Sequence, residues 1–104
     1  MAYRKYLITD NAKEDLNKIF EYICVELCNP KFAISFNEEL EETLNRICAF
    51  PQLYPVIENE NFRNECIRKV RLKNYLLYYS FDVITDVVIV LRMVYAKRNL
   101  DDLF

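Results

Sequence analysis

The sequence predicts one α+β domain in which an N-terminal strand and a helical hairpin precede a three-stranded antiparallel meander. Apolar residues recur at three- and four-residue steps over residues 12–27 and 33–47, the spacing of two amphipathic helices. Residues 66–72, 75–82 and 87–95 are rich in β-branched and aromatic residues and are separated by short connections. That arrangement is typical of antiparallel strands joined by tight turns. We therefore expect the helices to pack on one face of an antiparallel sheet and the opposite face to carry the function.

Length and composition favour a single soluble domain spanning residues 1–104. The chain has 104 residues, of which 53% are hydrophobic and 29% are charged. This length fits one hydrophobic core. No apolar stretch reaches the roughly 18 residues that span a bilayer, and residues 1–10 lack the apolar segment of a signal peptide. We expect a cytoplasmic protein that does not contact a membrane.

The first half of the chain predicts a strand over Tyr3–Thr9 and two helices after it. Thr9, Asp10 and Asn11, which end this strand, are all suited to cap the first helix. Asn29 and Pro30 suit the start of the second helix, which Pro51 ends. The short connection between the helices predicts an antiparallel hairpin. The predicted apolar stripes are Ala12, Leu16, Ile19, Phe20, Ile23 and Leu27 in the first helix, and Ala33, Phe36, Leu40, Leu44 and Ile47 in the second.

The second half predicts a loop over Pro51–Arg63 and then the meander. The last strand is almost continuously apolar over Val87–Leu91, so we expect it to be central and buried on both faces. The chain contains no glycine. Left-handed turn positions should therefore fall to residues such as Asn74 or Asp86. The absence of glycine also excludes every Gly-rich phosphate-binding loop.

The chain has four cysteines, Cys24, Cys28, Cys48 and Cys66, and no histidine. In a reducing compartment the usual state of a cysteine is a free thiol buried among apolar residues. A zinc site built from Cys24, Cys28 and the other two thiols is the alternative, but the spacing contains no CxxC pair. We expect no metal and no cofactor.

Charge is segregated along the chain although the net charge is only −2. Residues 10–60 contain eleven acidic and four basic residues, whereas residues 61–98 contain eight basic and three acidic residues. This asymmetry indicates a basic surface for an anionic partner and an acidic back. The low overall isoelectric point, about 5.2, argues against broad nonspecific binding of nucleic acid.

The basic segment also contains most of the candidate functional residues. Guanidinium groups hold phosphate or carboxylate through paired hydrogen bonds, and phenol rings stack on bases or donate a proton. Side chains alternate along a strand, so Tyr78 and Tyr79 should point to opposite faces, and Arg92 and Tyr95 should also be separated. The candidate binding residues are Arg68, Arg71, Lys73, Tyr78, Arg92, Lys97 and Arg98.

A series of short patterns in order resembles the RelE/ParE superfamily of toxins from bacterial type II toxin-antitoxin systems. The patterns are Ala12, Asp15 and Leu16; Phe50-Pro51; Arg68 before Val-x-Leu; Asn74-Tyr75-Leu76-Leu77-Tyr78-Tyr79; and Leu91-Arg92-x-Val94-Tyr95-Ala96-Lys97-Arg98. The resemblance covers nearly the whole chain. It implies the predicted fold, growth inhibition, and a cognate antitoxin that neutralises the toxin by adding a helix or a strand to it.

Two activities are implied by the two branches of this superfamily. In ribonuclease members, basic and aromatic residues cleave messenger RNA in the ribosome without a metal. Arg68, Arg92 and Arg98 are then candidates for a phosphate clamp, and Tyr95 for stacking or the acid role. Other members bind and poison DNA gyrase.

Two departures from the ribonuclease pattern favour the second activity. Leu76 stands where an arginine is common, and Tyr95 stands where a histidine is frequent, so no general base can be assigned. We therefore expect an inhibitor that binds a protein target such as DNA gyrase. A ribosome-dependent endoribonuclease and a non-toxic interaction module remain the alternatives.

Overall fold

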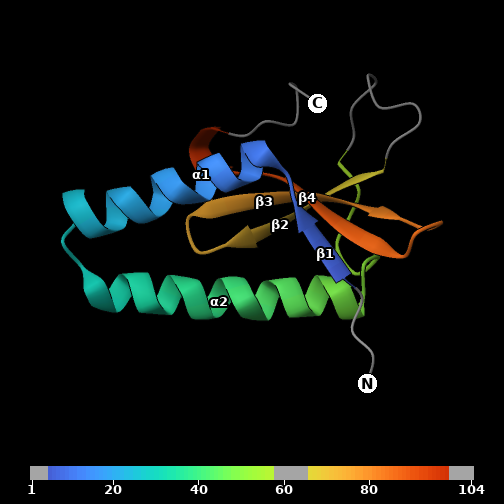
Figure 1. Cartoon of the computed structure of the whole chain (residues 1–104), viewed down its shortest axis with the longest axis horizontal. Coiled ribbons are helices and arrows are strands. Elements are labelled where there is room, and N and C mark those ends of the chain that lie inside the picture. Colours follow the sequence, from blue (N-terminus) through green and yellow to red (C-terminus); the bar gives the residue numbers. More distant parts are fainter. Residues whose placement is uncertain (1–4, 58–65, 99–104) are drawn as a thin grey trace.

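The chain folds as an α+β domain with two helices packed on one face of a four-stranded sheet (Figure 1). The computed structural model describes residues 5–57 and 66–98. The strands lie in the order β1-β4-β3-β2, where β1 is Lys5–Ile8, β2 is Ile67–Leu72, β3 is Tyr75–Asp82 and β4 is Val87–Tyr95. The meander β2-β3-β4 is antiparallel, as predicted, whereas β1 pairs with β4 in parallel. The sheet is therefore mixed, and the prediction of an antiparallel sheet is wrong for β1. No tight turn joins β1 to β4, so no local connection sets their relative direction.

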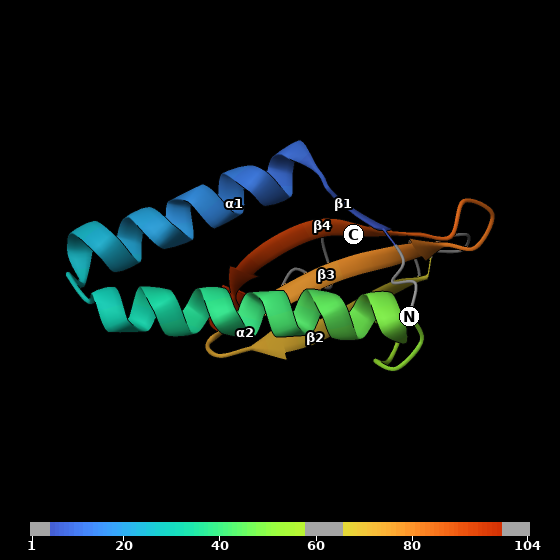
Figure 2. The same cartoon turned by 60° about the horizontal axis from the view of Figure 1, so that its bottom comes forward.

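The two helices form the predicted antiparallel hairpin, and together they cover one face of the sheet (Figure 2). Helix α1 is Asp10–Glu21 and helix α2 is Pro30–Ala49. Thr9 caps α1 by accepting a hydrogen bond from the Ala12 amide at 3.2 Å, and Asn29 caps α2 by accepting one from the Phe32 amide at 3.1 Å. The predicted cap Asn29 is confirmed, and of the three candidates Thr9, Asp10 and Asn11 the cap of α1 is Thr9.

The first helix differs from its prediction at its C-terminal end. A single π-helical turn, η1 (Tyr22–Glu26), follows α1, and the Leu27 amide donates to the Tyr22 carbonyl at 3.1 Å. A π turn holds more residues than an α turn, so the residues after it rotate away from the α-helical stripe. Leu27, predicted in the buried stripe, is therefore exposed. Cys28 then leaves the helix with a positive φ of 46°.

The main core lies between the helices and the sheet. Ala12, Ile19, Ile23, Phe36 and Ile47 contribute from the helical side, as the periodicity predicted. Tyr75, Leu77 and Tyr79 of β3 and Val88, Val90 and Met93 of β4 contribute from the sheet. Strand β4 is central in the order, but Val87 and Ile89 are only partly buried because they lie on the face that no helix covers. The prediction that β4 is buried on both faces is wrong for these two residues.

The face of the sheet without helices carries a second buried cluster. Ile57, Ile67, Leu76, Tyr78 and Val94 form it, and Leu91 and Ala96 pack against it. The prediction that this face is left open for function is therefore wrong in its centre. Local strand patterns did not reveal the cluster because Ile57, from the segment after α2, completes it.

A β-bulge interrupts the pairing of β3 with β4. Tyr78 is opposite Arg92 and Tyr79 is opposite Val90, so Leu91 is the extra residue on β4. A bulge reverses the alternation of side chains along the strand that contains it. Val88, Val90 and Met93 therefore share the helix-facing core although their numbers differ in parity. Strict alternation along the strand, the basis of the sequence prediction, therefore fails across Leu91.

Turn positions and cysteines differ in part from the predictions. Asp86 has a positive φ of 59°, as expected, but Lys73, with φ 53°, takes the position predicted for Asn74. Cys48 is a buried free thiol, whereas Cys24, Cys28 and Cys66 are exposed, contrary to expectation. Within residues 5–57 and 66–98, no group of three or more Cys, Asp or Glu is placed to hold a metal. Neither of the described α-helices has the length and apolar character needed to cross a bilayer.

Tyr79 links the core to the segment that follows α2. Because its hydroxyl is buried, we expect the folded protein to lose stability at alkaline pH. Burial raises the pKa of its hydroxyl to about 12, and the hydroxyl donates to the Pro51 carbonyl at 2.8 Å. The hydroxyl of an unfolded tyrosine has a pKa of about 10. Above that pH the native state therefore retains a proton that the unfolded state loses. The protonated Tyr79 hydroxyl therefore makes its full contribution to the free energy of unfolding below about pH 10. This contribution falls by about 2 kcal/mol as the pH rises toward 12.

Urea unfolding at about pH 9 and about pH 11 measures this effect. The Tyr79→Phe variant retains the ring but cannot ionise at this position, so it should lose less stability than the parent chain between the two conditions. Equal losses in the two proteins would contradict the assignment.

Candidate functional site

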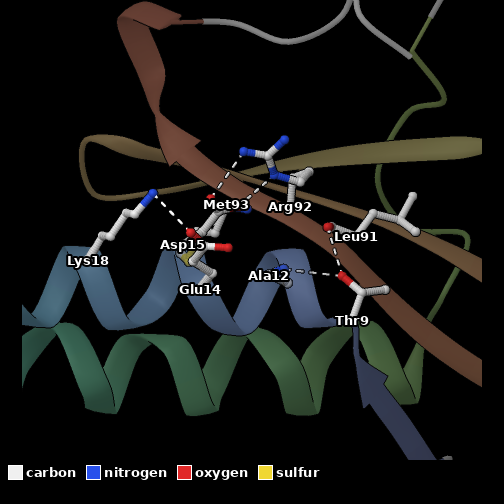
Figure 3. Close-up of polar contacts among 8 residues, drawn as sticks. All are labelled: Thr9, Ala12, Glu14, Asp15, Lys18, Leu91, Arg92 and Met93. Carbon is white, nitrogen blue, oxygen red and sulfur yellow. Dashed lines mark hydrogen bonds and ion pairs between the residues drawn. The ribbon is translucent and has the colours of Figure 1, made fainter.

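Arg92, the first candidate for a phosphate clamp, is held by an ion pair within the chain (Figure 3). Its Nε donates to Asp15 Oδ2 at 2.7 Å, and its second guanidinium nitrogen, Nη2, donates to Asp15 Oδ1 at 3.1 Å. The Asp15 side chain is only 12% exposed and that of Arg92 is 28% exposed. The hydrogen bonds to Asp15 raise the pKa of Arg92. Such a bidentate, partly desolvated pair has well-defined geometry and resists competing anions.

Asp15 and Thr9 also close the edge of β4 where β1 ends. The pairing of β1 with β4 stops at Val90, and beyond this point Asp15 Oδ2 accepts a hydrogen bond from the Met93 amide at 3.0 Å. The Thr9 amide donates to the Val90 carbonyl at 3.1 Å, and the Thr9 hydroxyl donates to the Leu91 carbonyl at 3.0 Å. The cap and the second turn of α1 therefore satisfy backbone groups around the bulge that would otherwise form an open edge.

Arg68 is engaged at the other edge of the sheet. Its guanidinium donates to the Tyr54 carbonyl at 2.6 Å, and Arg68 forms an isolated antiparallel bridge with Val56. Arg68 lies opposite Tyr79, which faces the helices, whereas Arg92 lies opposite Tyr78, which belongs to the cluster on the other face. Directly opposite residues share a face, so the two arginines leave opposite faces of the sheet. Arg68 therefore fastens the segment after α2 to the edge of the sheet, and the three arginines predicted as a phosphate clamp have different surroundings in this structure.

The other predicted binding residues occupy different environments. Tyr78 is fully buried in the second cluster, so its ring is not exposed for contact with another molecule. Arg71 donates from Nε to the carbonyl of Lys73 at 2.9 Å and is exposed. Lys73 forms an ion pair with Glu39 at 3.3 Å and lies 5.4 Å above the ring of Phe32. Lys97 is exposed on the short 3₁₀ turn η2, Ala96–Arg98.

Tyr95 and Arg98 lie together at a cavity beside the end of β4. The cavity has a volume of about 510 Å³ and lies between α1, η1, the start of α2 and the β2–β3 turn. Tyr95 is 46% exposed there, and its ring meets that of Tyr75 edge to face at 5.9 Å. Lys18 and Arg98 supply positive charge to the walls, while the carboxylate of Asp15 is already paired with Arg92. We call this feature the β4-end cavity.

Aromatic rings connect the β4-end cavity to the core. Phe36 contacts Phe20 at 5.3 Å and Tyr75 at 5.4 Å, both edge to face. Burial raises the pKa of Tyr75, and the nearby hydroxyls of Tyr22 and Tyr95 act in the same direction. Edge-to-face pairs hold rings in fixed orientations. The cavity thus has a rigid aromatic floor and a cationic rim, which suits an anionic partner group that carries apolar or aromatic surface.

Sequence reasoning found Tyr95 and Arg98 but missed most of this cavity. Lys18, Tyr22 and Leu27 belong to the first helical segment, and Phe32 belongs to α2. The four-residue step from Lys18 to Tyr22 places both side chains on one helical face, which is a usable signal. The position of Leu27 at the cavity could not be predicted, because the spacing of apolar residues does not reveal the π turn that exposes this side chain.

The fold and this cavity together define a small α+β binding domain whose helical hairpin packs on a mixed sheet. Residues 6–100 match the model of the ParE toxin of the type II toxin-antitoxin system parDE. The chain therefore belongs to the ParE toxin family and is a type II toxin.

Three solved structures are similar to the chain in fold. A chain of the P. aeruginosa ParDE system is 16% identical with a TM-score of 0.67, and the match covers 89% of this chain and 96% of that one. A chain of the Mycobacterium tuberculosis RelBE2 complex is 18% identical with a TM-score of 0.63, covering 90% and 99%. A chain of the Pyrococcus horikoshii RelE-RelB complex is 20% identical with a TM-score of 0.61, covering 95% and 100%. No curated protein sequence matches this chain.

Proposed function

We propose that this toxin inhibits growth by binding a protein target such as DNA gyrase, without cleaving RNA. The proposal rests on the contacts that the three arginines of the predicted phosphate clamp make in this structure. Arg92 is paired with Asp15, Arg68 is bonded to the Tyr54 carbonyl, and only Arg98 of the three lies at the β4-end cavity. Phosphoryl chemistry needs converging cations and groups that transfer protons, whereas binding needs only a surface of the right shape and charge.

We further propose that a cognate antitoxin neutralises the toxin in the cytoplasm. The P. aeruginosa, M. tuberculosis and P. horikoshii structures are all of toxin-antitoxin systems or complexes, which supports an antitoxin partner. Acidic side chains of that partner would complement the cations among residues 66–98, and exposed Arg71, Lys97 and Arg98 are the candidates for this contact.

A ribosome-dependent endoribonuclease is the second candidate, and one observation favours it. Tyr95, Lys18 and Arg98 line the same cavity, so a phenol that can stack or donate a proton and two cations border one space. The described residues around this cavity include no histidine, since the chain has none.

A supercoiling assay with purified gyrase tests the first proposal. The toxin is expected to inhibit supercoiling of relaxed plasmid, and its antitoxin is expected to reverse the inhibition. The Arg98→Glu variant should inhibit less, while Lys13→Glu, an exposed charge reversal on α1, serves as the matched control. Undiminished supercoiling at saturating toxin would exclude gyrase as the target.

A further inference from the structure

Asp15 is part of the wall of the β4-end cavity. Its two carboxylate oxygens accept hydrogen bonds from Arg92 at 2.7 Å and 3.1 Å, and Oδ2 also accepts one from the Met93 amide at 3.0 Å. The Arg92 side chain is 28% exposed, so solvent reaches it, whereas that of Asp15 is only 12% exposed. Figure 3 shows the two side chains meeting between α1 and β4. The cavity wall therefore contains a carboxylate that already holds a guanidinium.

A phosphate group cannot use Arg92 while this pair is intact. To reach the guanidinium, the phosphate would have to displace both hydrogen bonds to Asp15. The displaced carboxylate would then be largely buried, without its cation and next to a second negative charge. Both changes are unfavourable, because a desolvated charge needs a partner and like charges repel at short distance. Asp15 thus occupies Arg92 and also opposes the binding of phosphate beside it.

The other charged groups at the cavity leave little positive charge in excess. Lys18 lines the cavity but pairs with Glu14 at 3.2 Å. Asp15 balances Arg92 in the same way, so Arg98 supplies the net positive charge of these five groups. The affinity of a protein for RNA rises steeply with the number of cations that contact phosphates. A single cation in excess therefore suits one carboxylate of a protein partner better than a chain of phosphates.

We propose that Asp15 is a specificity-determining residue of the β4-end cavity, because it withholds Arg92 from phosphate and so directs the site toward protein rather than RNA. This inference rests on the proposed function, in which the toxin binds a protein target. It adds that one carboxylate sets the preference. Loss of that negative charge should turn the cavity into a site that also binds the phosphates of RNA.

Asp15→Asn removes the charge and retains most of the local structure. The asparagine oxygen can take the position of Oδ2, where it still accepts from the Met93 amide and from Arg92 Nε. The asparagine nitrogen then faces Nη2 of Arg92, and two donors cannot form a hydrogen bond with each other. The guanidinium therefore loses one of its two bonds and its compensating charge, while the edge of β4 keeps its acceptor.

Fluorescence anisotropy with a short fluorescein-labelled single-stranded RNA tests the proposal on the full chain. At low salt, Asp15→Asn should bind this RNA about tenfold more tightly than the parent chain. Its logarithmic salt dependence should be steeper by about 0.7, the value for one additional phosphate contact on a single strand. Asp10→Asn makes the same substitution at the exposed first residue of α1, and its affinity for the RNA should stay close to that of the parent.

Adding Arg92→Gln to Asp15→Asn provides the sharper test. If the gain comes from the released guanidinium, the double variant should return to the RNA affinity of the parent, whereas a gain from a loosened β4 would persist. Urea unfolding shows that each variant is folded. A single variant that binds RNA no better than Asp10→Asn, or a gain that persists in the double variant, would overturn the proposal. Failure of the parent toxin to inhibit gyrase would contradict the proposed function but would not change these RNA affinities, so the two results are separate.

Discussion

Replacing Asp15 with alanine is expected to lower the free energy of unfolding by about 2–3 kcal/mol. The substitution leaves the guanidinium of Arg92 without its bidentate partner and removes the acceptor of the Met93 amide. Breaking a partly buried pair costs this much because the remaining charge and the amide are left unsatisfied. Urea unfolding of the parent and variant chains at neutral pH measures the difference.

Glu14→Ala is the matched control for this substitution. Glu14 precedes Asp15 on α1 and pairs with Lys18 at 3.2 Å, but both side chains are mostly exposed. Exposed pairs of this kind contribute below about 0.5 kcal/mol. If Asp15→Ala and Glu14→Ala lowered the free energy of unfolding by equally small amounts, the stability of the β4 edge would not depend on Asp15. Arg92 would then be a candidate for binding a ligand.

Combining Tyr95→Ala with Arg98→Glu is expected to abolish growth arrest while leaving the fold intact. Both residues line the β4-end cavity and both are exposed, so the change removes an aromatic wall and reverses a charge without opening the core. Colony formation under induction should return to the uninduced level. Circular dichroism and the thermal midpoint of the purified variant show whether folding is retained.

Two outcomes would contradict this assignment. Growth arrest that persists in a folded Tyr95→Ala, Arg98→Glu chain would place the toxic surface elsewhere. The same relief of arrest from Lys13→Glu would show that any loss of positive charge weakens the toxin. The Asp15→Ala variant is unsuitable as a control here, because its expected loss of stability would itself reduce toxicity.

The elements of this fold were predictable because each depends on local patterns. Thr9 and Asn29 mark the two helix starts, and the three- and four-residue steps of residues such as Ile19 and Phe36 mark the buried faces. Strands β3 and β4 match their predicted bounds, Tyr75–Asp82 and Val87–Tyr95. Family resemblance and local periodicity agreed on the element order, which explains why the fold class is confirmed.

The geometry of the candidate site was less predictable because it depends on contacts that are distant in sequence. The bulge at Leu91 reverses the alternation of β4, and a chain without glycine offers no obvious residue to mark it. Thr9 and Asp15 stabilise this region from the opposite end of the chain. An arginine in a strand pattern likewise does not reveal whether its partner is a ligand or, as for Arg92, an internal carboxylate.

Several predicted features lie outside the described residues. Tyr3 in the first predicted strand, residues 58–63 of the predicted loop and Asn99–Phe104 at the C-terminus belong to this group. The predicted boundaries can be compared only within 5–57 and 66–98. There the first strand ends at Ile8 and not at Thr9, α2 ends at Ala49 and β2 starts at Ile67.

Mapping the 5′ ends of messenger RNA after brief induction of the toxin tests the central claim most directly. The proposed binding mechanism predicts no new ends at codon positions while growth stops. Plasmid isolated from the same culture should show reduced negative supercoiling. New ends at fixed codon positions that disappear in the Tyr95→Ala, Arg98→Glu chain would contradict the claim, because they would show that the β4-end cavity cleaves RNA.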